Sequence, residues 1–119
     1  MARVVNPKRG EIWLVSFEPQ VGEEIKKTIP ALILNVEVMN HLPTRLAIPS
    51  REKKSHHHTN FYYVPIDPVR QNGLTKPSTI DCSQIKSLSL QRFVKKLGKA
   101  HYDILGEIVK VMALAVGYL

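Results

Sequence analysis

Hydrophobic residues up to residue 98 come in short runs that are separated by proline, glycine or charged residues. Runs of this length, rich in β-branched and aromatic residues, predict strands rather than helices. The first two runs are apolar on both alternating faces, which indicates strands buried on both sides of a sheet. The predicted strands are residues 11–17, 31–36, 44–48, 61–66, the interrupted strand 78–88, and 94–98.

The segments between these runs are polar and carry turn residues. Residues 20–28 and 50–60 predict two charged surface loops, and the pair Asn72-Gly73 predicts a turn. Proline interrupts strand pairing, so we expect Pro49 to close the third strand. Residue 50 is then expected to begin a loop.

In the C-terminal segment the apolar residues recur at three- and four-residue spacings, as in a helix, and not in the short runs of the preceding segments. Its acidic residues Asp103 and Glu107 lie in the first turns of the expected helix, where they suit the helix dipole. We predict one amphipathic helix over residues 102–116. The whole chain, 1–119, is then a single domain, mainly β with a C-terminal helix, built on a small curved antiparallel sheet. The apolar residues that recur at helical spacing are Ile104, Ile108, Val111, Met112, Ala115 and Leu119.

Charge narrows the possible partners. The chain has a formal net charge of +7 and a pI of about 9.7, which favours a polyanion such as nucleic acid. Its single cysteine, Cys82, excludes an intrachain disulfide and is expected to pack as a small hydrophobe. No signal peptide and no run long enough to cross a bilayer is visible, so we expect a cytoplasmic protein without a membrane partner.

Several short motifs follow one another in order along almost the whole chain. They are Arg9-Gly10-Glu11-Ile12-Trp13-Leu14-Val15, Gly22-Glu23-Glu24, Pro30-Ala31-Leu32-Ile33-Leu34, Gly73-Leu74 with Ser78, Gln84-Ile85, Arg92, and Lys95-Lys96-Leu97-Gly98-Lys99. Together they resemble the MazF/PemK family of toxins. The resemblance implies an SH3-like barrel, a homodimer, and a ribosome-independent endoribonuclease that cuts mRNA or other single-stranded RNA. It also implies a cognate antitoxin protein as partner, and no metal or other cofactor.

Cleavage of RNA without a metal sets clear chemical requirements. The 2′-hydroxyl is the nucleophile, so a general base, a general acid and a cation near the phosphate are needed. In the family, an arginine directly before the strand's proline supplies the cation, but here Ile29 stands before Pro30. Loss of one such group typically costs about 3–4 kcal/mol of transition-state stabilisation.

The resemblance and the neighbouring charges give four candidate catalytic residues. Ser50 resembles the family's threonine or serine after the third strand, and Glu24 matches its loop glutamate, a possible general base. Lys27 and Arg51 are the cations that would replace the missing arginine.

The candidate RNA-binding residues are basic or aromatic: Lys26, Lys53, Lys54, Phe17 and His56. Trp13 is expected in the core instead, since its strand is apolar on both faces. For the run 56–58, a surface loop is favoured over a metal site, because consecutive side chains alternate in direction and no partner ligand is at metal spacing.

Three functions remain open on sequence alone. The first is an active endoribonuclease toxin. The second is a degenerate family member that binds RNA or an antitoxin and cuts poorly, which Ile29 favours. The third is a protein–protein adaptor that reuses the barrel. A steep loss of RNA affinity with added salt would argue against the third.

Overall fold

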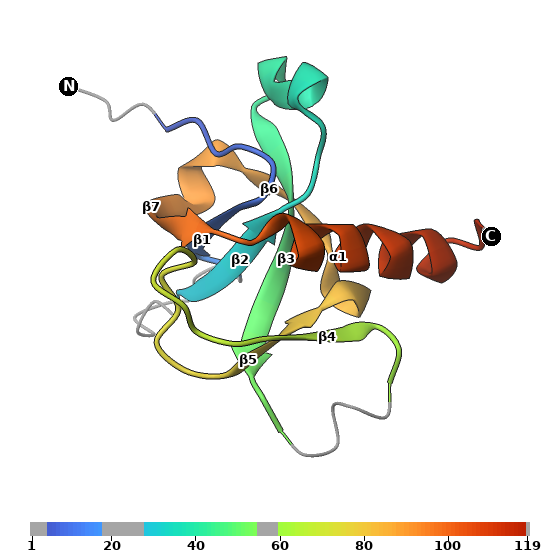
Figure 1. Cartoon of the computed structure of the whole chain (residues 1–119). Helices are drawn as coiled ribbons and strands as arrows, with labels where there is room; N and C mark the ends of the chain where they lie inside the picture. Colours follow the sequence, from blue (N-terminus) through green and yellow to red (C-terminus); the bar gives the residue numbers. More distant parts are fainter. Residues whose placement is uncertain (1–4, 18–27, 55–59, 119) are drawn as a thin grey trace, which may run out of the picture.

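The fold is a curved antiparallel sheet with one helix laid across it (Figure 1). The computed structural model describes residues 5–17, 28–54 and 60–118. Within them, the sheet of seven strands has the order β4-β5-β3-β2-β1-β7, with β6 also paired to β3. The strands are β1 (Glu11–Val15), β2 (Ile29–Ile33), β3 (Thr44–Glu52), β4 (Tyr63–Ile66), β5 (Ser78–Asp81), β6 (Lys86–Ser89) and β7 (Phe93–Lys99).

Helix α1 (Tyr102–Ala115) confirms the predicted C-terminal helix and the mainly β fold class. Ile108 and Val111 bury one side of α1 against the sheet, while the far end of α1 extends beyond it (Figure 1). No helix in the described part of the chain is long and apolar enough to cross a membrane. The other helical turns are short: η1 (Glu37–His41), η3 (Cys82–Gln84) and η4 (Leu90–Arg92).

Strand β3 is longer than predicted and does not stop at Pro49. Residues 47–49 pair with β2, and residues 50–52 pair with β5 on the other edge. Pro49 is therefore tolerated inside β3, because it lies where the strand exchanges one partner for another. The prediction that a loop begins at residue 50 is wrong: Ser50, Arg51 and Glu52 are strand residues.

The interrupted strand 78–88 is confirmed in outline. Both β5 and β6 run antiparallel to β3, and the turn η3 separates them. The Asp81 carboxylate accepts a hydrogen bond from the Ser83 amide and so caps η3. The break shifts the register between the two halves.

Both faces of the central strands are covered, which explains their unbroken apolar runs. Ile12, Leu32 and Ile48 belong to a core between the sheet and α1. Trp13 and Phe93 belong to a second core on the opposite face, where their rings meet edge to face at a centroid distance of 6.1 Å. The core position predicted for Trp13 is confirmed.

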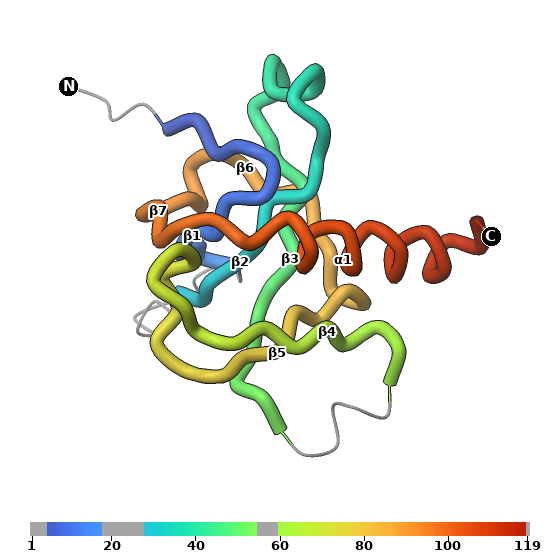
Figure 2. The backbone as a smooth tube through the Cα atoms, in the orientation of Figure 1, coloured from blue at the N-terminus to red at the C-terminus, as the bar shows by residue number. Residues whose placement is uncertain are grey.

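The predicted turn at Asn72-Gly73 forms, but by a different mechanism from a hairpin turn. Asn72 is buried, and its amide group donates to Asp67 O and accepts from the amides of Val69 and Leu74. Gly73 has a φ of +72°, and a Cβ there would lie 2.1 Å from Leu97 O. The Asn72 side chain thus adds to the backbone hydrogen bonds of the turn, and Gly73 lets the turn approach β7 closely (Figure 2).

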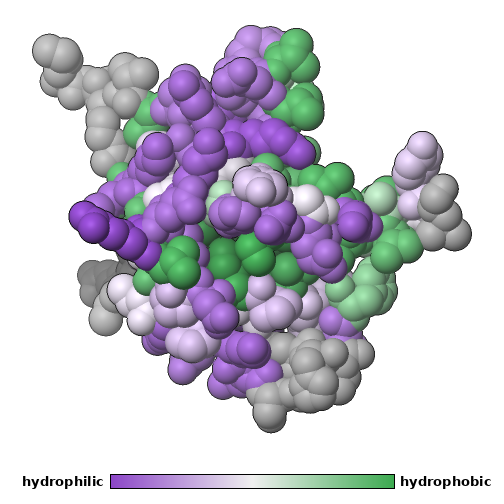
Figure 3. Space-filling view, viewed as in Figure 1, coloured by the Kyte–Doolittle hydropathy of each residue, from purple (hydrophilic) through white to green (hydrophobic). Residues whose placement is uncertain are grey.

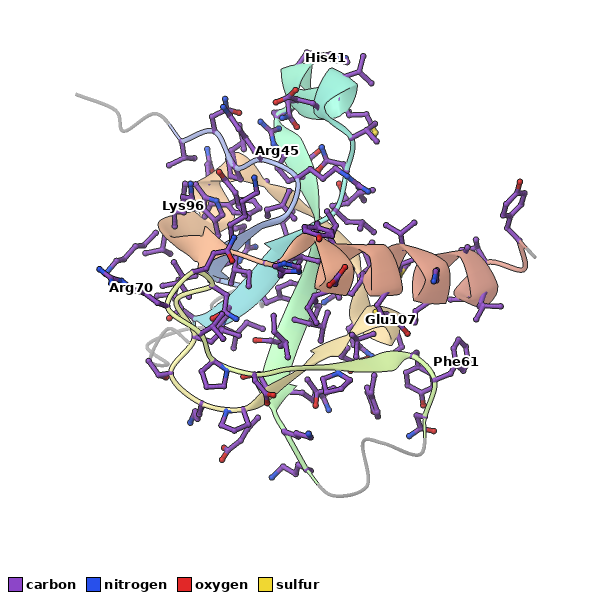
Figure 4. All side chains as sticks on the ribbon, in the orientation of Figure 1. His41, Arg45, Phe61, Arg70, Lys96 and Glu107 are labelled. Atoms are coloured by element: carbon purple, nitrogen blue, oxygen red, sulfur yellow. The ribbon has the colours of Figure 1, made fainter. Side chains whose placement is uncertain are left out.

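Arg45 is buried, a feature that the sequence pattern did not predict. It is 2% exposed, and its side chain extends from β3 to the N-terminal segment (Figure 4). Its guanidinium donates to Pro7 O, Leu42 O and Thr44 O and to Asn6 Oδ1. Burial lowers the pKa of Arg45 from its usual value, and the carbonyl dipoles hold the charged form in place.

Glu11 organises a second buried polar group. Its carboxylate accepts from Trp13 Nε1 and from the Lys8 amide, each at 2.9 Å, and lies 3.0 Å from Lys96 Nζ. Burial alone raises the pKa of Glu11, but the hydrogen bonds from Trp13 and Lys8 and the Lys96 charge together lower it.

We expect Glu11→Gln to destabilise the fold by about 1–3 kcal/mol at neutral pH, since buried donors lose a charged acceptor. A carboxylate with a lowered folded-state pKa stabilises above its unfolded pKa, and this contribution is lost as the pH falls through the folded pKa. The difference in the free energy of unfolding between the wild type and Glu11→Gln should therefore become smaller at acidic pH. Urea unfolding from neutral to acidic pH measures it, and a constant difference would contradict the role given to the charge.

Gly73→Ala should lower the free energy of unfolding by more than about 1 kcal/mol, because both its φ and the approach of Leu97 exclude a Cβ. Gly106→Ala is the matched control. Its Cβ would meet nothing within 4 Å, and we expect a gain of up to about 1 kcal/mol in α1. Thermal unfolding of both variants tests the contrast, and equal melting temperatures would refute it.

Candidate functional site

Two grooves meet where β3 exchanges its partners. The first, here called the serine groove, has a volume of about 420 Å³ and lies beside the turn that follows Asn72. The second, the arginine groove, has about 370 Å³ and lies beside Phe17 and Gln84. Both grooves are lined by Ile29, Ser50, Arg51 and Glu52.

Ser50 lies at the junction and is almost covered. Its side chain is 6% exposed, and its Oγ donates a hydrogen bond to Pro30 O at 2.9 Å. Pro30 follows Ile29, so the hydroxyl lies next to the position at which the resemblance expects an arginine. The bond fixes Oγ at the end of β2 and leaves its lone pairs as acceptors.

Arg51 is held by a buried acid on the neighbouring strand. Its guanidinium lies 3.4 Å from the carboxylate of Asp81, whose side chain is 2% exposed, whereas half of the Arg51 side chain stays in solvent. The same carboxylate also accepts from the Ser83 hydroxyl. An acid oriented in this way fixes the guanidinium while leaving N–H donors for a further anion.

Ser50 and Arg51 are brought to one end of β3, but their side chains leave it on opposite faces. Adjacent strand residues alternate in direction. Ser50 pairs with Ile80 of the core beneath α1, and Arg51 lies on the face of Asp81. A ligand that touches both groups must therefore pass over the edge where the two grooves meet.

The walls of the junction are apolar. Ile29 pairs with Val15 and packs against the second core, and its apolar side chain brings no charge to the junction. Phe17 is 8% exposed, and the ammonium of Lys86 lies 5.3 Å from its ring centroid. Burial leaves a small part of the Phe17 ring for a base, and its stacking role stays a prediction.

Several groove residues were not singled out in the sequence. Thr75 and Lys76 line the serine groove, and Lys76 Nζ lies 3.8 Å from the Glu52 carboxylate. The Gly73–Ser78 motif marked this segment as a family feature without giving it a role. Asp81 carried no local signal, because its contact with Arg51 depends on the pairing of β5 with β3.

The remaining predicted residues divide into two groups. Lys53 and Lys54 are exposed at the end of β3, and Lys54 lines the arginine groove. Four lie outside the described residues: Glu24, Lys26, Lys27 and His56. Among the described residues, no three His, Cys, Asp or Glu side chains gather as a metal site would require.

Cys82 packs in the core as predicted. It is 1% exposed, and burial together with the neighbouring Asp81 carboxylate raises the pKa of its thiol to about 11. A thiol with this pKa stays protonated at neutral pH and is a poor nucleophile.

The arrangement suits a phosphodiester. The Ser50 hydroxyl, the Arg51 guanidinium and the Lys76 ammonium line the serine groove together with apolar side chains. The Glu52 carboxylate lines both grooves. These groups can hold an anion and stabilise added negative charge on it.

The sequence matches a known protein family over most of its length. Residues 8–116 match the family described as PemK-like, MazF-like toxin of type II toxin-antitoxin system. The chain is 30% identical to Endoribonuclease PemK from Escherichia coli over 105 residues, which is 86% of this chain and 76% of that protein.

Solved structures share the fold. MazF from Deinococcus radiodurans (form I) superposes with a TM-score of 0.75 at 22% identity, over 96% of this chain and 99% of that chain. A MazE–MazF structure from the same organism (form II) gives 0.78 at 22% identity, over 98% and 100%. A mycobacterial endoribonuclease in complex with its cognate antitoxin gives 0.73 at 18% identity, over 95% and 97%. The family match, which spans nearly the whole sequence, means that the chain belongs to the PemK/MazF family of toxins of type II toxin–antitoxin systems.

Proposed function

We propose that this toxin is an endoribonuclease that cleaves single-stranded RNA without a metal ion. The observation that carries the proposal is the junction of two grooves at Ser50 and Arg51, with Arg51 fixed by Asp81. Family membership and the kinship with an endoribonuclease support it. The excess of 17 basic over 10 acidic residues supports a polyanionic substrate.

The proposed reaction is an internal transfer at phosphorus. A general base takes the proton of the 2′-hydroxyl while its oxygen attacks the adjacent phosphorus. The bond to the 5′-oxygen breaks and this oxygen takes up a proton from water, which gives a 2′,3′-cyclic phosphate and a 5′-hydroxyl. Ser50 contacts a phosphate oxygen, while Arg51 and Lys76 stabilise the added charge. Glu52, in the groove, and Glu24, outside the described residues, are the candidate general bases.

Arg51 is proposed to replace the cation that Ile29 does not supply. Ile29 packs against the second core and carries no charge, so a cation elsewhere in the groove must stabilise the phosphate. A guanidinium already oriented by a buried carboxylate loses less freedom on binding than a free side chain. Lys27 remains the alternative source, and a poorly cutting RNA binder remains the alternative function.

A protein antitoxin and a second toxin copy are the proposed partners, with the cytoplasm as the place of action. MazE–MazF from D. radiodurans and the mycobacterial complex are the related assemblies that support the antitoxin. A homodimer is supported by the far end of α1, where Leu114, Val116 and Tyr118 are 49%, 75% and 77% exposed. Hydrophobic side chains gather there in Figure 3, and a second copy would cover them.

We expect the purified protein to cut a long single-stranded RNA in EDTA at discrete sites. Ser50→Ala and Arg51→Ala should each slow cleavage about a hundredfold, because each removes a group that stabilises the charged transition state. Primer extension locates the cuts, and analysis of the ends identifies the cyclic phosphate.

Matched controls are available on the surface. Ser87→Ala on β6 and Arg70→Ala remove the same groups from exposed positions, and Arg70 projects away at the edge of the molecule (Figure 4). Cleavage that survives both site variants would refute the site. Wild-type protein that binds RNA in a salt-sensitive manner yet leaves it intact would favour the alternative function.

Asp81→Asn should slow cleavage about tenfold while RNA affinity changes less, because the amide keeps an acceptor for Ser83 but no longer fixes Arg51 by charge. In the Arg51→Ala background the same substitution should have little further effect on the rate. A double-mutant cycle on the cleavage rate tests this coupling. Independent effects would mean that Asp81 acts only through stability.

A further inference from the structure

A basic hollow lies apart from the two grooves. It has a volume of about 500 Å³ and is enclosed by the N-terminal segment, the end of β7 and the start of α1. Its basic side chains come from all three, with Lys8 and Arg9 from the N-terminal segment, Lys99 from β7 and the His101 imidazole from the start of α1. We call it the basic pocket.

Main-chain hydrogen bonds build this pocket. The Gly10 amide donates to Ile33 O at 2.8 Å, and the Ala100 amide donates to Gly10 O at 2.9 Å. The Lys99 amide donates to Gln71 O, also at 2.9 Å. The segments that carry the basic residues are therefore joined by hydrogen bonds, so their backbone needs little ordering when a ligand binds.

Most of the positive charge in the pocket is free to meet a ligand. Two carboxylates line it, but Glu11 is already bound by Trp13, the Lys8 amide and Lys96, which leaves Glu37. Within the described part of the chain, no carboxylate lies within 4 Å of the ammonium groups of Lys8 and Lys99. Arg9 gives one N–H to Leu34 O and keeps its other donors.

An aromatic pair stands at the rim. The rings of His101 and Tyr102 lie 4.2 Å apart between centroids at an angle of 31°, and Tyr102 is 76% exposed. The Asp103 carboxylate lies 3.5 Å from His101 Nδ1, and its side chain is largely exposed. Exposed aromatic faces beside free cations are the combination that binds the bases and phosphates of single-stranded nucleic acid.

The pocket lies in line with the serine groove. On β7, Leu97 lines the groove and Lys99 lines the pocket, and a strand rises about 3.3 Å per residue, so about 7 Å separates them. The turn beside β7 repeats this order, with Gly73 in the groove and Gln71 in the pocket. One RNA strand can therefore follow β7 from one to the other.

We propose that the basic pocket is an RNA subsite, which binds a phosphate and a base of the single strand beyond the cleavage groove. This inference rests on the proposed function, because the strand in the pocket is the one that is cut. Lys8 and Lys99 contact the phosphate, and Tyr102 stacks on the base. The pocket increases affinity for RNAs long enough to reach it and does not take part in the chemistry.

The test compares the double variant Lys8→Ala/Lys99→Ala and the single variant Tyr102→Ala with a control, Lys95→Ala/Lys110→Ala. The control lysines are exposed, lie outside the pocket and the grooves, and change the charge equally. Thermal unfolding checks that each variant folds. The probes are a long 2′-O-methyl RNA, which binds without being cut, a short one that fills only the groove, and adenosine monophosphate.

Fluorescence anisotropy over a salt series gives the expected results. The double variant should bind the long RNA about tenfold more weakly than the control, with a log–log salt slope smaller by about 0.7, because the contact with one phosphate is lost. Tyr102→Ala should weaken it by about five- to a hundredfold. Each pocket variant should bind the short 2′-O-methyl RNA as tightly as the control variant does. Each should also cleave an unmodified RNA of the same short sequence at the rate of the control variant.

Other outcomes overturn the inference in distinguishable ways. Long-RNA affinity equal to the control, with cleavage intact, would refute the subsite and leave the proposed function standing. Adenosine monophosphate binding that needs Lys8 and Lys99 while long-RNA binding does not would refute it in favour of a free-nucleotide site. A wild-type protein that neither binds nor cuts RNA at low salt would overturn both proposals.

Discussion

The exchange of partners along β3 is the constraint on which the grooves depend. Up to Pro49 the strand is tied to β2, and from Ser50 onward it is tied to β5. The two partners lie on opposite edges of β3, and the Ser50 hydroxyl still donates a hydrogen bond to Pro30 O of β2. A proline suits this position, since it offers no amide hydrogen to either partner. The two grooves thus meet at the point on β3 where its pairing changes, and both are lined by Ser50 and Arg51.

Two local devices keep the surroundings of these grooves in shape. Asn72 satisfies the backbone of the 67–74 turn from inside, and Gly73 lets the turn contact β7. On the opposite face, Asp81 caps η3 and holds Arg51 with the same carboxylate. A structural acid and an oriented cation are therefore one feature, which joins the stability of η3 to the electrostatics of the arginine groove.

Basic side chains of the described residues extend along one path from groove to pocket. Arg51 and Lys76 line the serine groove, and the basic pocket further along holds Lys99 at the end of β7 and Lys8 from the N-terminal segment. Single-stranded RNA is extended and carries one charge per nucleotide, so separated cations along a path are more useful than one dense cluster.

The sequence by itself determined the architecture, because hydrophobic period depends on which faces are buried. It predicted most strands and the helix 102–116, placed Trp13 and Cys82 in the core, and through its motifs indicated the family. Contacts between residues far apart in the chain were decided only by the tertiary structure. No local pattern could pair Arg51 with Asp81, continue β3 through Pro49, bury Arg45 under carbonyl groups, or bring Lys8 beside Lys99, since each needs strands to meet in a particular register.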